Sequence, residues 1–147
     1  MLRLSKKTDY AIILLTHLAT TSDPVSAQEM SCKYHLPQPM VANILKQLAS
    51  EGIVESKRGQ QGGYLLKVMP SKITVSQIVN ITDNEFSLVD CVHHTESCKI
   101  AQWCPTKDPL AALHQQIEQF LQSLTLDQIL NHPQFNWRSS DENAYIS

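Results

Sequence analysis

The chain has 147 residues, of which 42% are hydrophobic and 18% are charged. These values are ordinary for a folded globular domain, so the composition excludes a chain that is disordered throughout. The richest apolar run, residues 11–15, is broken by Thr16 and His17 and is far shorter than the roughly 18 residues that suggest a membrane span. The sequence therefore predicts one compact unit, or little more than one, that does not cross a membrane.

The net charge of −2 conceals a difference between the two halves of the chain. Residues 1–72 hold nine Lys and Arg against five Asp and Glu, which is +4, whereas residues 73–147 hold three against nine, which is −6. A basic first half favours contact with a polyanion such as nucleic acid.

A secretory leader is conceivable, because basic residues precede the apolar run and residues 25–27 resemble a cleavage site. However, Asp9 lies at the edge of the run, and residues 26–29 (SAQE) have the S-x-x-E pattern that starts a helix. We therefore expect a cytoplasmic protein, whose cysteines are reduced thiols that bind metal or do redox chemistry when clustered.

Three helices are predicted in the basic half, at about residues 5–19, 26–34 and 39–50. The first two begin at serines that can act as N-caps, and the third has a proline at its first position. Gly52 can supply the left-handed residue that ends the third helix. Because only residues 35–37 separate the second helix from the third, the pair predicts a helix-turn-helix.

A β-hairpin is predicted next, since the apolar segments 53–54 and 64–66 flank a polar, glycine-bearing and basic stretch. A capping-box pattern at Thr74 and Gln77 then starts a fourth helix. This order predicts a mainly α fold with a small β-hairpin wing, and it assigns residues 1–82 to a winged helix-turn-helix that binds DNA.

The second helix of a helix-turn-helix presents its first residues to base edges in the major groove. Its apolar residues at 41, 44, 45 and 48 are expected to face inward, which leaves Gln38, Met40, Asn43 and, less clearly, Gln47 outward. Gln and Asn can bond adenine, and a methionine can contact a thymine methyl group. Positive charge would come from Lys46, Lys57 and Arg58. The alternatives are an ordinary solvated helix face and a winged helix that binds only protein.

Three cysteines lie in the predicted long loop at residues 83–107, with the spacing Cys91-x6-Cys98-x5-Cys104. Thiols so close together in a polar segment can converge on one soft metal centre. Spacing alone does not separate zinc, with His93 or His94 as a further ligand, from an iron–sulfur cluster, and a disulfide with a spare thiol is a third reading. Cys32 is expected to pack beside the core. The sequence contains no catalytic motif, so an enzyme is not expected.

A long helix is predicted to begin at Asp108-Pro109. Its apolar residues alternate in steps of three and four, which is the pattern of a heptad seam. The seam consists of Leu110, Leu113, Ile117, Phe120 and Leu124. We expect residues 108–130 to contain a dimerisation helix and a short following helix, and residues 131–147 to form a flexible tail.

Taken together, residues 1–11 (MLRLSKKTDYA), the wing at 58–66 (RGQQGGYLL) and the three-cysteine loop resemble a known family. Over about residues 1–130, their order and spacing resemble the bacterial winged-helix regulators that include IscR, NsrR and RirA. The cysteine intervals look most like the branch that regulates SUF-type iron–sulfur assembly genes. The resemblance implies a homodimer on double-stranded DNA and an iron–sulfur cluster, [2Fe-2S] favoured over [4Fe-4S], bound by Cys91, Cys98 and Cys104.

The fourth ligand differs among these relatives. In IscR a histidine three residues after the last cysteine completes the coordination, but this chain has Lys107 there, and an ammonium group is a poor ligand. NsrR-like relatives use an aspartate early in the first helix of the other subunit, and Asp9 matches it. Asp9 therefore ranks first, ahead of His93 or His94 and then Asp108.

The resemblance implies a transcriptional repressor that senses its cluster and controls iron–sulfur assembly genes. Because the cysteine loop joins the DNA-binding domain to the dimerisation helix, cluster occupancy is expected to alter the angle between the two recognition helices. One alternative is a nitric-oxide sensor of the NsrR kind, and another is a zinc-stabilised module that binds protein. No small-molecule substrate is expected.

Overall fold

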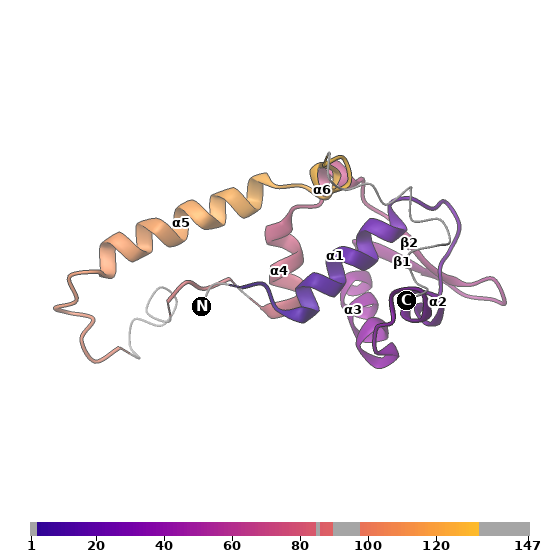
Figure 1. The fold of residues 1–147 in the computed structure, drawn as a ribbon, viewed down its shortest axis with the longest axis horizontal. Coiled ribbons are helices and arrows are strands. Elements are labelled where there is room, and N and C mark those ends of the chain that lie inside the picture. The colour runs from indigo at the N-terminus through magenta and orange to yellow at the C-terminus, as the bar shows by residue number, and fades with distance from the viewer. Residues whose placement is uncertain (1–2, 85, 90–97, 133–147) are drawn as a thin grey trace, which may run out of the picture.

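The computed structural model describes residues 3–84, 86–89 and 98–132. Most elements form a helical head with a small hairpin, and one long helix extends away from it (Figure 1). The helices are α1 (Lys6–Leu18), α2 (Ala27–Tyr34), α3 (Gln38–Ser50), the short 3-10 helix η1 (Pro70–Lys72), α4 (Val75–Asp83), α5 (Lys107–Ser123) and α6 (Leu126–Leu130). The strands are β1 (Val54–Lys57) and β2 (Gly63–Leu66), which pair antiparallel. No helix in these described ranges is both long and apolar enough to cross a membrane.

Local capping chemistry places the starts of α1, α2 and α4 where the sequence predicts them, whereas α3 begins at Gln38, one residue before the predicted Pro39, without a side-chain cap. The Ser5 hydroxyl accepts the Thr8 N–H at 3.1 Å, and the Ser26 hydroxyl does the same for the Glu29 N–H at 3.1 Å. At α4 both bonds of the capping box form between Thr74 and its partner three residues on, at 3.0 and 3.2 Å. These bonds satisfy backbone donors that have no partner within the helix.

The core of the head is formed by α1, α3 and α4 together with α6. Leu14, Leu15, Ile44 and Ile78 are fully buried, and so is Leu126 of the short last helix. The chain therefore returns to the head after α5. Backbone bonds secure this return, since Leu126 N–H donates to the Ile73 carbonyl at 2.8 Å and Val75 N–H donates to the Leu124 carbonyl at 2.9 Å.

The hairpin is joined to the start of α2. Val25 and Tyr64 exchange two backbone hydrogen bonds, at 3.0 and 2.8 Å, so the residue before the helix cap pairs with β2. Gly63 permits this approach, because a Cβ atom there would lie 2.5 Å from the Val25 carbonyl carbon. The wing is thus joined to the helix-turn-helix by backbone hydrogen bonds.

Helix α5 starts one residue earlier than the sequence predicts. The helix begins at Lys107, and the residue before it, Thr106, makes no side-chain capping bond. Asp108 is therefore not the cap but lies in the first turn, where a negative charge interacts favourably with the positive end of the helix dipole. We call residues 84–106, which join α4 to α5, the cysteine segment.

Candidate DNA interface and cysteine segment

Helix α3, the recognition helix of the predicted helix-turn-helix, has the buried and exposed faces that its sequence predicts. Its apolar residues Val41, Ile44, Leu45 and Leu48 are fully buried. The predicted base-reading and phosphate-binding residues on this helix are all exposed, namely Gln38, Met40, Asn43 and Lys46. Their exposure leaves them free to contact a ligand, and their role in DNA binding stays a prediction.

Gln47 does not belong to this exposed set. It is half-buried, and its side-chain oxygen is buried without a hydrogen-bond partner among the described residues. The residue lies three positions after Ile44 and directly before Leu48, at the edge of the apolar face, so the head covers its carbonyl end. An unpaired buried acceptor of this kind costs about 1–3 kcal/mol.

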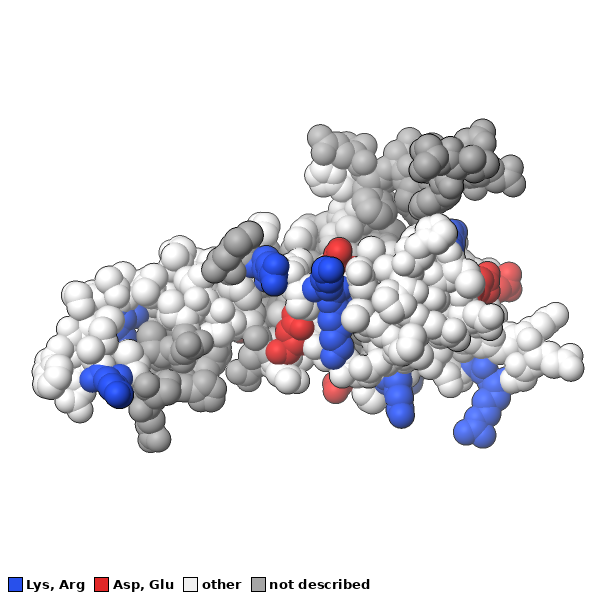
Figure 2. Space-filling model, turned by 60° about the horizontal axis from the view of Figure 1, so that its bottom comes forward, with Lys and Arg blue, Asp and Glu red and all other residues white. Residues whose placement is uncertain are grey.

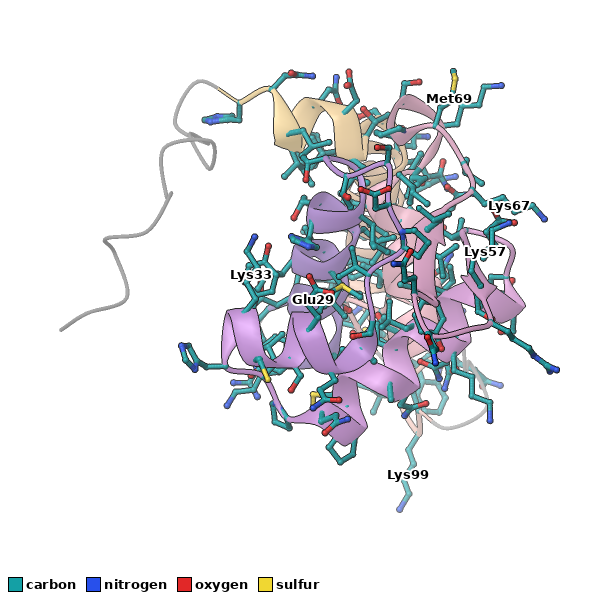
Figure 3. All side chains as sticks on the ribbon, turned by 90° about the vertical axis from the view of Figure 1, so that its right-hand side faces the viewer. Glu29, Lys33, Lys57, Lys67, Met69 and Lys99 are labelled. Atoms are coloured by element: carbon teal, nitrogen blue, oxygen red, sulfur yellow. The ribbon has the colours of Figure 1, made fainter. Side chains whose placement is uncertain are left out.

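The wing carries one basic residue that the sequence analysis missed. Lys57 and Arg58 are exposed as expected, and the Lys57 ammonium lies 3.2 Å from the Glu55 carboxylate. Lys57 pairs with Gly63, and Lys67 is four residues beyond Gly63, so strand alternation puts both lysines on the same side of the hairpin (Figure 3). This parity could have identified Lys67 from the predicted hairpin alone.

On the face of the molecule shown in Figure 2, the Lys and Arg side chains are spaced apart, with acidic side chains between some of them. This distribution agrees with the modest +4 of residues 1–72 (nine basic against five acidic side chains).

Two of the three predicted sulfur ligands are described. Cys98 and Cys104 are free thiols and both are half-buried, whereas Cys91, His93 and His94 lie outside the described residues. Residues 98–106 of the cysteine segment lie at the end of α5 that is remote from α6 (Figure 1). Within the described ranges, no three His, Cys, Asp or Glu side chains come together as a metal site.

The surroundings of Cys104 favour its metal-binding form. Its sulfur lies 3.3 Å from the Thr106 hydroxyl oxygen, and this hydrogen bond is the largest cause of a lowered pKa of the thiol, with smaller support from the charge of Lys107. A lower pKa raises the fraction of thiolate, which is the species that binds metal. The donor chemistry of the described thiols therefore fits a soft metal centre such as an iron–sulfur cluster.

The oxygen candidates and the fourth cysteine are all at the surface. Asp9, in the first turn of α1, and Asp108 are exposed, so each is available to a second subunit. Cys32 is also exposed, which shows that the expected packing beside the core is wrong. The reason is that α2 buries only Met30 among its described residues, so its other positions face outward.

A histidine that sequence reasoning left without a role contacts the beginning of the cysteine segment. His114 is the buried residue of α5 within the described ranges. Its ring stacks on Phe86 with 5.4 Å between centroids and 7° between planes, and the Leu88 N–H donates to its Nδ1 at 3.4 Å. Residues 86–89 are thereby held against α5. A lone histidine has no sequence pattern that could have indicated this contact.

Comparison with known proteins shows the family to which this chain belongs. The Rrf2 family of iron-dependent transcriptional regulators matches residues 4–132 of the chain. The chain belongs to the Rrf2 family. This Rrf2 chain is 29% identical over 133 residues to the HTH-type transcriptional regulator IscR of Pectobacterium atrosepticum, covering 89% of this chain and 80% of that protein. It is 27% identical over 112 residues to the regulator NsrR of Bacillus licheniformis, covering 74% and 78% respectively.

Solved structures confirm the fold of this Rrf2 chain. T. potens IscR superimposes with a TM-score of 0.68 at 27% identity, over 88% of this chain and 86% of that one. CymR, the global cysteine regulator of B. subtilis, gives a TM-score of 0.71 at 24% identity, over 88% and 96%. The chain is therefore a winged-helix transcriptional regulator, and these relatives are regulators rather than enzymes, as the sequence predicts.

Proposed function

We propose that this Rrf2 protein is a homodimeric repressor whose binding to DNA depends on an iron–sulfur cluster held by Cys91, Cys98 and Cys104, and that it controls SUF-type iron–sulfur assembly genes. The observation that carries the proposal is the position of the cysteine segment. It joins the head, which bears the exposed recognition helix, to α5, which bears the exposed apolar seam. Any group bound there contacts the connection between DNA reading and subunit pairing.

The thiols supply the binding chemistry. Cys98 and Cys104 are six residues apart and each is half-buried, and the lowered pKa of Cys104 favours a thiolate ligand. Thiolates are the usual protein ligands of iron–sulfur clusters, and a bound cluster would supply redox sensitivity. Asp9 is the proposed fourth ligand, provided by the second subunit, because it is exposed and matches the aspartate that NsrR-like relatives use. Among the described residues, no third His, Cys, Asp or Glu side chain joins Cys98 and Cys104.

The exposed side of α5 supports a second copy of the chain as its partner. Leu113 and Phe120 are 44% and 63% exposed, and the other seam residues, Leu110, Ile117 and Leu124, are half-buried. Apolar residues at this spacing favour a partner helix with the same spacing. Each head would then present α3 and its wing to one half of a two-fold symmetric DNA site.

The decisive test is anaerobic purification followed by iron, sulfide and zinc analysis and by DNA-binding titrations. We expect a coloured protein that contains iron and acid-labile sulfide and binds its own promoter and a SUF promoter. Cys98→Ser should abolish the cluster and change DNA affinity by about fivefold or more. Cys32→Ser is the matched control, because this exposed cysteine lies on α2 outside the cysteine segment, and it should change neither property.

Other outcomes would contradict parts of the proposal. A colourless protein with stoichiometric zinc after attempted anaerobic reconstitution would favour a zinc-stabilised interaction module. Loss of the cluster to nitric oxide but not to oxidants or iron limitation, without binding to assembly promoters, would favour an NsrR-like sensor. Failure to bind DNA at low salt, both with and without the cluster, would contradict regulation itself.

A further inference from the structure

A carboxylate at the end of α4 is bound by hydroxyl groups of α1. The Ser5 hydroxyl donates to one oxygen of Asp83 at 2.7 Å, and the Thr8 hydroxyl donates to the other oxygen at 2.7 Å. The Thr82 hydroxyl oxygen lies 2.6 Å from that of Thr8 and completes the group. We call these four residues the Asp83 clamp. It joins positions that are 74 to 78 residues apart in the chain.

The negative charge of Asp83 is unfavourable at the end of its own helix, α4, but favourable in its contact with α1. Asp83 is the last residue of α4, and a negative charge is unfavourable at the C-terminal end of a helix. The same carboxylate lies at the N-terminal end of α1, where Ser5 is the N-cap and a negative charge is favourable. Both carboxylate oxygens accept a hydrogen bond there, which ties the two helix ends together.

The Asp83 clamp lies where the cysteine segment leaves the head. The chain turns directly after Asp83, because Asn84 has a positive φ of 74°. On the other side, Thr8 is fully buried and precedes Asp9, the exposed residue proposed as the fourth ligand. In the proposed dimer, each clamp thus adjoins the cysteine segment of its own chain and, through Asp9, the cluster site of the second subunit.

From the clamp, α1 leads directly to the DNA-reading elements. Leu14 and Leu15 of α1 belong to the same buried core as Ile44 of the recognition helix. Near its other end, the His17 ring nitrogen Nδ1 lies 2.9 Å from the Tyr34 hydroxyl of α2. A displacement of the first turn of α1 would therefore be transmitted through packed side chains to α2 and α3.

We propose that Asp83 is a positioning residue that couples the cysteine segment to the DNA-reading head through Ser5 and Thr8. This inference rests on the proposed function, because it concerns how the state of the cysteines changes DNA affinity. Through the clamp, a change at the cysteines alters the DNA affinity of the head. Weakening the clamp removes this dependence, while the head and the cysteine segment each keep their own fold.

The test is a double-mutant cycle between Asp83 and Cys98. DNA dissociation constants are measured for wild type, Asp83→Asn, Cys98→Ser and the double variant, with the cysteine-intact proteins purified anaerobically. Asparagine is similar in size but cannot accept both hydroxyl protons. We expect the change in affinity caused by Cys98→Ser to shrink by about fivefold or more when position 83 is asparagine.

A second pair of variants covers the case in which Asp83→Asn does not fold. Thr8→Val removes only the hydroxyl at nearly constant volume and should reproduce the uncoupling. Thr8→Ser keeps the hydroxyl and should restore the wild-type response. Asp127→Asn is the matched control, since this carboxylate is on α6, where it accepts a hydrogen bond from the nearby Asn131, and it should leave the response unchanged.

Hydrogen exchange supplies a readout besides DNA binding. Amides of the first turn of α1 should exchange faster in Cys98→Ser than in wild type, and this difference should disappear in Asp83→Asn. Equal effects of Asp83→Asn on DNA affinity in both cysteine backgrounds would reduce Asp83 to a structural role and overturn the inference. If Cys98→Ser leaves wild-type DNA affinity unchanged, the proposed function itself fails, and that result is visible before position 83 is altered.

Discussion

A buried histidine makes the stability of the head depend on pH. His17 packs edge-on against Tyr34, with ring centroids 5.5 Å apart, and its pKa is lowered from the usual value near 6.5. Burial is the main cause and the charge of Lys33 adds to it, while Glu29 opposes it. The folded state therefore binds fewer protons than the unfolded state once the pH falls below about 7.

We expect the free energy of unfolding to decrease as the pH is lowered from 7.5 to 5.5. The contribution of His17 is fully present above its unfolded pKa and is lost progressively as the pH falls toward its lower folded value. Urea titrations of wild type and His17→Asn at several pH values isolate this contribution, because asparagine does not titrate. Parallel pH profiles for the two proteins would contradict the assignment to His17.

We expect Glu55 to compete with DNA phosphate for Lys57. The two side chains lie 3.2 Å apart and both are partly exposed to solvent, so the ion pair itself is weak. Glu55→Gln should strengthen DNA binding by about two- to fivefold at low salt, and the gain should shrink as the salt concentration rises. Fluorescence anisotropy at a series of salt concentrations measures this.

Glu51→Gln removes the same charge from the end of α3 and is the control for Glu55→Gln. Glu51 is exposed and lies at the C-terminal cap of the recognition helix, whereas a helix-turn-helix contacts bases with the N-terminal part of this helix. An equal gain from both variants would show a general charge effect rather than release of Lys57.

At the scale of elements, the position of the wing depends on its pairing with the residue before α2. Gly63→Ala would place a Cβ atom against the Val25 backbone, and backbone atoms cannot move aside as a flexible side chain can. We expect a loss of about 1–3 kcal/mol in the free energy of unfolding and weaker DNA binding. Gln61→Ala, at the exposed wing tip, is the control and should leave stability nearly unchanged.

Denaturant titration and hydrogen exchange check the Gly63→Ala prediction. The amides of Val25 and Tyr64 form the bridge and should lose protection before those of the core helices do. Unchanged protection at these two amides would show that the wing does not depend on this pairing.

Contacts between residues that are close in the sequence could be predicted, whereas contacts between distant residues could not. Caps such as Ser5 and Thr74 could be predicted because they bond to residues three positions away. The inward face of α3 could be predicted because helical periodicity determines it. The partner of Asp83 could not, because a contact 78 residues away leaves no local pattern.

In the candidate site, too, features set by one helix could be predicted and features set by packing between distant segments could not. The exposure of Gln38 and Asn43 follows from the periodicity of their own helix, whereas the exposure of Cys32 depends on how shallowly α2 packs on the head. The contact of His114 with Phe86 depends on the path of the cysteine segment over α5, which no pattern in the sequence specifies.

At the scale of the whole molecule, the exposed seam of α5 determines the oligomeric state that we propose. Phe120→Glu places a charge on this seam, at a residue that is 63% exposed in the single chain and therefore contributes little to the head. We expect the variant to be a folded monomer by analytical ultracentrifugation, with DNA affinity reduced at least tenfold because each monomer reaches only one half-site.

Gln119→Glu adds the same charge beside the seam and should leave the dimer intact, because this position is exposed and polar. A dimer that persists in Phe120→Glu, or dissociation in both variants, would show that subunits associate through a different surface.

The bridge between Val25 and Tyr64 restricts how the protein can adapt to different operators. Because two backbone hydrogen bonds join the hairpin to the residue before α2, we expect the wing and α3 of one head to keep a constant geometry on DNA. Tolerance for operators of unequal length must then arise where the two heads are joined. Selection of alternative promoters by this protein should accordingly track the separation of the half-sites more closely than the sequence within each of them.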